Sequence, residues 1–136
     1  MDGATMRTLS VAFCGLVLAG VLTGCGPSVD EVRGQAISQY QVGHYPEAEN
    51  LFNQVLQRRP IDAESWYYLG RIAHAEKWYI RAMQCYEQSL RADPGYRPAQ
   101  TALEQVKQDL GPEMYEQLKT NPDLNKTIPY AEPKAK

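Results

Sequence analysis

The sequence has little net charge, because 14 lysines and arginines stand against 16 aspartates and glutamates in 136 residues. A protein that binds a polyanion by charge presents a strongly basic surface, so nucleic acid is excluded as a partner. Paired cysteines are missing as well. The three cysteines, Cys14, Cys25 and Cys85, form no C-x-x-C pair, which excludes zinc-ribbon and thioredoxin-type sites.

Enzyme motifs are also absent. The chain contains no G-x-S-x-G, no H-E-x-x-H and no glycine-rich phosphate loop. Its two histidines, His44 and His74, lie far apart, so we expect neither a metal nor a cofactor. Cys85 lies in the interior of a predicted helix, and we expect it to be a small packing residue rather than a reactive thiol. We therefore predict that the chain is not an enzyme, with one alternative left open: a cryptic catalytic site around His74, Arg71 and Glu76.

Long apolar runs are limited to the front of the chain. No charged side chain lies between Arg7 and Asp30, and the apolar run Leu9 to Leu22 has about 14 residues. A membrane-spanning helix needs about 20 apolar residues. A short apolar run between a basic residue and small residues is typical of a secretory signal. An uncleaved membrane-spanning segment stays as the alternative, and the initiator is either Met1 or Met6.

The end of this run, Leu22 to Cys25 (LTGC), resembles the lipoprotein box of bacterial lipoproteins. The resemblance implies that residues 1–24 are a cleaved signal peptide and that Cys25 carries a diacylglycerol and an N-acyl chain. Two or three acyl chains anchor a protein stably where one chain is marginal. Residues 25–28 then form a short tether. Because Gly26 follows the cysteine, the resemblance implies that the protein is sorted to the outer membrane of a bacterial cell envelope and faces the periplasm.

The remainder of the chain repeats itself. A shift of 34 residues aligns the segment from Ala63 with the segment from Val29, and it pairs small residues with small, aromatic with aromatic and proline with proline. The pairs are Ala36 with Gly70, Tyr45 with Tyr79, Ala48 with Ala82, Phe52 with Tyr86, and Pro60 with Pro94. The exceptions are Gly34 with Tyr68 and Val55 with Ser89.

Residues 63–94 resemble the tetratricopeptide repeat, a family whose period is 34 residues. The resemblance rests on Trp66, Leu69, Gly70, Tyr79, Ala82, Tyr86 and Pro94. It implies an all-α solenoid of about 2.5 helix-turn-helix repeats. The units are a first repeat at 29–62, a second at 63–96 and a partial third at 97–119, followed by a proline-rich tail at 120–136 that we expect to be disordered.

Local signals predict the same helices. Ser28 and Glu31 have the spacing of a capping box, and Gly43 followed by Pro46 predicts a helix end and a new helix start. Apolar residues then recur on one face of each second helix. The predicted helices are 29–42, 46–58, 62–75, 78–91, 97–110 and 112–119.

In this family the first helices of successive pairs line a concave groove. The groove-facing residues that the resemblance implies are Arg33, Ile37, Tyr40 and Gln41 in the first repeat, Tyr67, Tyr68, Arg71 and His74 in the second, and Thr101, Gln105 and Gln108 in the third. Tyrosine and arginine are enriched at interface hot spots, although tyrosines also occur on ordinary helix surfaces. The family's carboxylate clamp for chaperone tails requires an asparagine where Ile37 stands.

We therefore expect a lipid-anchored adaptor that holds an envelope protein or peptide in the groove. Such lipoproteins serve in the assembly of pili, secretion machines or outer-membrane complexes. About three repeats are needed for a stable array, and Gln35 and Gln39 stand where the family buries apolar groups. Self-association into a homo-oligomer, or completion by a partner's helix, would compensate for this short array.

Overall fold

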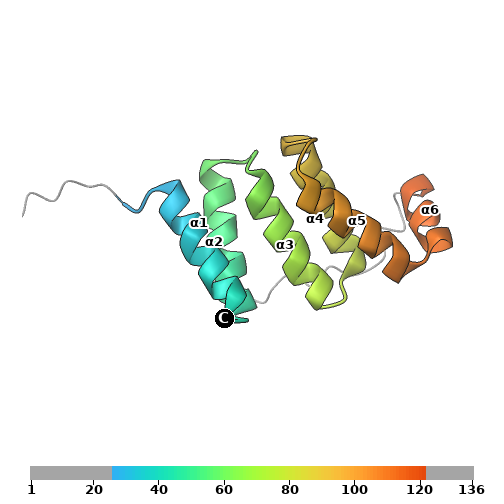
Figure 1. Ribbon diagram of the computed structural model, residues 1–136, viewed down its shortest axis with the longest axis horizontal. Helices are drawn as coiled ribbons and strands as arrows, with labels where there is room; N and C mark the ends of the chain where they lie inside the picture. The colour runs from blue at the N-terminus through green and yellow to red at the C-terminus, as the bar shows by residue number, and fades with distance from the viewer. Residues whose placement is uncertain (1–25, 122–136) are drawn as a thin grey trace, which may run out of the picture.

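The computed structural model describes residues 26–121, which form six helices joined by short turns. They are α1 (Val29–Gln41), α2 (Tyr45–Arg58), α3 (Ala63–Ala75), α4 (Tyr79–Ala92), α5 (Arg97–Leu110) and α6 (Pro112–Thr120). Every boundary lies within one residue of its predicted position, and no strand occurs in this part of the chain. Figure 1 shows the helices running alternately up and down and stacked along the long axis. The predicted all-α solenoid is therefore confirmed.

Several predicted segments lie outside the described residues. These are the leader 1–24, Cys25, and residues 122–136 of the tail. The tail was expected to begin at residue 120, but Thr120 still belongs to α6. Within residues 26–121, no helix combines the length and the apolar character that crossing a bilayer requires.

Local hydrogen bonds determine where the helices begin. The Ser28 hydroxyl accepts the Glu31 amide N–H at 3.1 Å, and the Glu31 carboxylate accepts the Ser28 N–H at 2.7 Å, which confirms the predicted capping box. Asp62 caps α3 by accepting the Ser65 N–H at 3.0 Å. Three of the other four helices, α2, α5 and α6, carry a proline in the first turn, where the missing N–H has no intrahelical partner to lose.

The turns inside the two full helix pairs share one geometry. Gly43 has φ +82°, its N–H donates to the Tyr40 carbonyl at 3.0 Å, and the His44 N–H donates to the Gln39 carbonyl at 2.9 Å. This is a Schellman ending, which reverses the chain tightly. The second pair makes the same turn 34 residues later with Lys77 at φ +62°. A side chain in this left-handed region costs about 1–2 kcal/mol, so the tertiary packing of α3 on α4 compensates for strain at Lys77.

Two apolar cores share α3. The first core lies between the two full repeats and contains Ala36, Ala48, Phe52, Leu56, Leu69, Ile72 and Cys85. The second lies between α3, α4 and α5 and contains Ala73, Ala82, Met83, Tyr86, Leu103 and Val106. Because α3 contributes to both, its position relative to α4 determines how the whole array is assembled.

The serine that interrupts the apolar pattern of α4 is accounted for by a hydrogen bond. Ser89 is fully buried, and its hydroxyl donates to the Ala63 carbonyl at 2.7 Å. A buried polar group with a partner carries little penalty. Ser89 therefore links the end of α4 to the first turn of α3. The first repeat has the buried Val55 at the corresponding position.

Helix α3 crosses α4 closely at Gly70. A Cβ atom at Gly70 would lie 2.5 Å from Cε1 and 2.6 Å from Cδ1 of Tyr86. Tyr86 is fully buried in the second core, so its ring has no free space into which to retreat. The first repeat uses Ala36 and Phe52 at the same two positions, both fully buried.

The polar residues of α1 were expected to weaken the first repeat, and the structure gives a different account. Gln35 is exposed, and Gln39 is half-buried with its side-chain oxygen 2.9 Å from Nδ1 of His44. They lie on the terminal helix of the array, where a polar outer face is what solvent requires. Neither residue therefore carries the penalty of an unpartnered buried polar group.

Gly70→Ala should lower the free energy of unfolding by about 1–3 kcal/mol, because the added methyl group would overpack against the Tyr86 ring. Gly34→Ala is the matched control. Nothing lies within 4 Å of an added Cβ at Gly34, and alanine in an exposed helix interior should raise the free energy of unfolding by about 0.5–1 kcal/mol. Urea unfolding followed by circular dichroism measures both; changes of the same sign would contradict the close crossing.

Candidate functional site

A groove of about 480 Å³ lies between α3 and α5. We call it the α3–α5 groove, and its lining residues are Tyr67, Arg71, His74, Pro98, Thr101, Ala102 and Gln105. Five of the seven are residues that the sequence predicted to face a groove. Pro98 and Ala102 were not predicted, because a proline in a first helical turn and an alanine on a helix carry no signal of their own for a binding site.

A row of tyrosine rings runs beside this groove. The tyrosine row consists of Tyr45, Tyr40, Tyr68, Tyr67 and Tyr96, and each ring centroid lies 5.1–5.7 Å from the next. These separations are those of favourable aromatic pairs. The row starts at α2, crosses α1 and α3, and ends just before α5, so it connects three repeats. Tyr45 and Tyr96 were not predicted as site residues, since both precede or begin helices.

Arg71 lies in the middle of the tyrosine row. Its guanidinium carbon is 5.9 Å from the Tyr40 ring centroid and 5.7 Å from that of Tyr67, within the range of cation–π attraction. Its Nη1 donates to the Tyr67 hydroxyl at 2.7 Å. Burial by itself would lower the pKa of Arg71, but the hydrogen bond to Tyr67 and the surrounding tyrosines raise it above its ordinary value. The residue is therefore a permanent cation.

Burial keeps the tyrosine hydroxyls protonated. It raises the pKa of Tyr40 and Tyr68 above the ordinary value and the pKa of Tyr96 to about 12. Burial also raises the pKa of Tyr86, whose hydroxyl has no hydrogen-bond partner in the described part of the chain. At neutral pH these groups are uncharged and can each donate a hydrogen bond.

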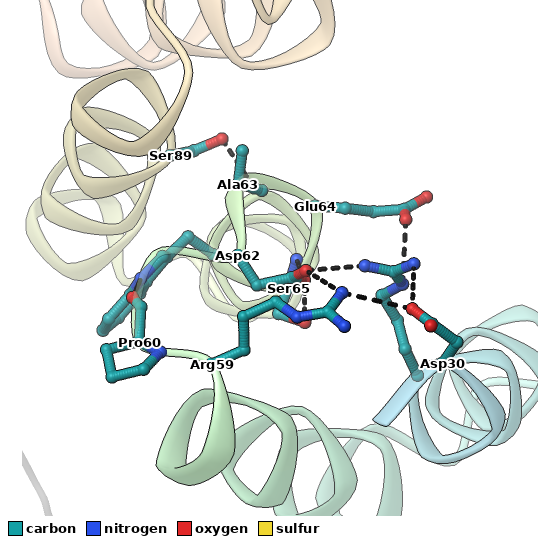
Figure 2. Close-up of polar contacts among 10 residues, drawn as sticks. Asp30, Arg59, Pro60, Asp62, Ala63, Glu64, Ser65 and Ser89 are labelled. Carbon is teal, nitrogen blue, oxygen red and sulfur yellow. Dashed lines mark hydrogen bonds and ion pairs between the residues drawn. The ribbon is translucent and has the colours of Figure 1, made fainter. Parts of the chain in front are cut away.

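Arg33 was predicted to face a partner, and the structure commits its guanidinium to internal ion pairs. Nη1 lies 2.6 Å from Asp62, Nη2 lies 2.8 Å from Asp30, and Nε lies 3.2 Å from Glu64. Figure 2 shows these carboxylates converging where α1 meets the start of α3, with Arg59 joining Asp30 and Asp62. Arg33 therefore fastens α1 to α3, and it offers no free nitrogen to a ligand.

The buried carboxylate at the centre of this ion-pair cluster has two tasks. Asp62 is only 6% exposed, and one of its oxygens accepts the Ser65 hydroxyl at 2.6 Å as well as the Ser65 N–H. Its other oxygen accepts from Arg33. A carboxylate that is buried but fully hydrogen-bonded avoids the large desolvation penalty of an isolated charge. Nothing in the sequence linked Asp62 to Arg33, because 29 residues separate them.

The far end of the groove contains a histidine–aspartate pair. Nε2 of His74 lies 2.7 Å from Oδ2 of Asp109, and the Gln105 side-chain amide donates to Oδ1 at 3.2 Å. These hydrogen bonds, that of His74 foremost, lower the pKa of Asp109 below its ordinary value. Asp109 was not predicted, although it continues the spacing of four residues that joins Thr101 to Gln105.

The remaining predicted residues lie away from the α3–α5 groove. Ile37 packs against the first core, and Tyr68 stacks on Phe52 with centroids 5.3 Å apart and an interplanar angle of 6°. Gln41 and Gln108 are exposed, and neither belongs to the groove lining. The predicted set thus divides into groove residues, tyrosine-row residues and residues that support the fold.

Reactive groups are sparse in this region. Among residues 26–121, no three histidine, cysteine or carboxylate side chains gather to form a metal site. Cys85 is buried, which raises the pKa of its thiol to about 11 and leaves it unreactive at neutral pH. Glu76 is an exposed residue at the end of α3, whereas Arg71 and His74 are engaged by Tyr67 and Asp109.

Comparison with known proteins agrees with this architecture. Residues 33–97 match the family model described as tetratricopeptide repeat, which spans most of the first helix pair and all of the second. No curated protein matches the sequence. Residues 33–97 are therefore similar to tetratricopeptide repeats, which form helical arrays with extended concave binding surfaces.

The pair of His74 and Asp109 should stabilise the fold only above acid pH. The folded-state pKa of Asp109 lies below its ordinary value of 3.8, so its contribution is present above that value and is lost as the pH falls through the folded-state pKa. Asp109→Asn should therefore show a smaller drop in urea midpoint between about pH 5 and pH 3 than the wild type.

Glu116→Gln, which removes an exposed carboxyl from α6, is the control for this measurement and should follow the wild-type curve. If Asp109→Asn also followed the wild-type curve, the hydrogen bond from His74 would contribute nothing to stability.

Proposed function

We propose that this protein is an adaptor that holds a segment of another protein in the α3–α5 groove. The observation that carries the proposal is the position of Arg71, held between two tyrosine rings at the edge of an open groove. Rigid aromatic side chains and arginine supply much of the binding energy in protein interfaces. Because their partners within the chain hold these groups in place, little conformational entropy is lost on binding.

The second part of the proposal concerns the membrane. The lipoprotein box at Leu22 to Cys25 predicts a lipid on Cys25, and only Gly26, Pro27 and Ser28 separate that residue from α1. The Pro27 carbonyl accepts a hydrogen bond from Nη1 of Arg58 at 2.8 Å, so the tether lies against the end of α2. A lipid on Cys25 would then hold the N-terminal end of the array at the bilayer surface.

The chemistry of the groove favours binding over catalysis. A general base needs a pKa near the working pH, whereas the pKa of Asp109, the partner of His74, is lowered. We infer that the protein is not an enzyme and requires no cofactor besides its lipid. An adaptor in the bacterial envelope, facing the periplasm, fits roles in assembling pili, secretion machines or outer-membrane complexes.

Cys25→Ser should release the protein from the membrane, because the acyl chains would have no thiol to which they could be attached. The measurement is fractionation of cells together with mass spectrometry of the mature amino terminus. Wild-type protein should begin at Cys25, carry acyl mass and sediment with membranes. An intact peptide from Met1 or Met6, or a Cys25 without acyl mass, would rule out the anchor while leaving the adaptor proposal standing.

Photocrosslinking in native envelopes tests the groove. A photoreactive residue in place of Thr101, on the groove lining, should capture one discrete partner species. The same residue in place of Gln84, exposed on α4, is the matched control and should not capture it. Equal capture from both positions would show that the interaction surface is not the groove. Crosslinked dimers of the chain itself would identify the partner as a second copy.

A further inference from the structure

Of the two basic side chains that line the α3–α5 groove, only His74 has an acidic partner within residues 26–121. Arg33 is paired with three carboxylates, and His74 is paired with Asp109. Between them stands Arg71, which has no acidic partner among residues 26–121 and contacts the rings of Tyr40 and Tyr67. The groove lining therefore contains a permanent positive charge that has no carboxylate partner among residues 26–121.

The guanidinium of Arg71 has unused hydrogen-bond donors. Its Nη1 is bonded to the Tyr67 hydroxyl, but Nη2 and Nε make no hydrogen bond with any described residue. A planar fork of N–H groups matches the two oxygens of a carboxylate. Contact with the rings of Tyr40 and Tyr67 restricts where the guanidinium can move, so the fork is held ready for a ligand.

Aromatic surface lies close to Arg71 on both sides. The tyrosine row extends to both sides of Arg71, through Tyr40 toward α2 and through Tyr67 to Tyr96. A ligand whose carboxylate meets Arg71 would therefore have aromatic surface to cover in both directions.

We propose that the groove recognises an aspartate or glutamate side chain within an extended segment of the partner, with the carboxylate on Arg71 and its neighbouring residues packed along the tyrosine row. This inference rests on the proposed adaptor function. A carboxyl at the end of a chain would have polypeptide on one side only, whereas the tyrosine row continues on both sides of Arg71. The unpaired charge of Arg71 supplies the complementarity that selects an acidic residue.

The experiment uses a display library of random eight-residue peptides, each flanked by polypeptide at both ends. Peptides that bind the detergent-purified full-length protein are selected. We expect the selected peptides to share one central aspartate or glutamate. Replacing that residue by its amide, measured by fluorescence anisotropy with the synthetic peptide blocked at both ends, should weaken binding about tenfold or more.

Variants of the protein locate the contact. Arg71→Gln should lose the preference, so that the acidic peptide and its amide bind it equally. Arg91→Gln, an exposed arginine on α4, is the matched control and should retain the full preference. Circular dichroism and thermal unfolding establish that both variants fold like the wild type.

The outcomes separate this inference from the function on which it rests. Peptides that bind the groove but show no acidic residue, or a preference that persists in Arg71→Gln, would overturn the inference and leave the adaptor function intact. Tighter binding of a peptide whose single carboxylate is its free C-terminus would also overturn it. If no peptide were selected, or if Thr101→Trp left binding unchanged, both the groove function and the inference would fall.

Discussion

The close crossing of α3 and α4 at Gly70 is the contact on which the rest of the structure depends. With a side chain at residue 70, the ring of Tyr86 could not lie under α3, and Tyr86 is the largest fully buried side chain of the described residues. The crossing brings α3 deep enough to contribute to both cores. A helix held from both sides is rigid, and rigidity is what a recognition surface needs.

That rigidity continues into the groove. Tyr67 and Arg71 flank Gly70 on α3, so the crossing that buries Tyr86 also presents these two residues to the α3–α5 groove. The ion-pair cluster around Asp62 fastens α1 to the start of α3 and thereby positions Tyr40 beside Arg71. Arginine and tyrosine are thus held by internal contacts, and the entropy of ordering them is lost on folding rather than on binding.

Helices and sites differ in how far local sequence predicts them. The capping box at Ser28, the glycine at residue 43 and the 34-residue period are local signals, and each helix forms within one residue of its predicted range. The pairing of charges around the groove was not predicted. Arg33 forms an ion pair with Asp62, which lies 29 residues away. Asp109 was not predicted as a site residue, although it pairs with His74 across 35 residues.

The sequence by itself determined the all-α repeat architecture, the helix boundaries and the set of aromatic and basic side chains available on the first helices. These depend on periodicity and on hydrogen bonds between residues a few positions apart. Only the tertiary structure decided which charges neutralise one another and which remain. Pairing across helices depends on how α1, α3 and α5 are placed side by side, and that arrangement leaves Arg71 without a carboxylate partner among residues 26–121.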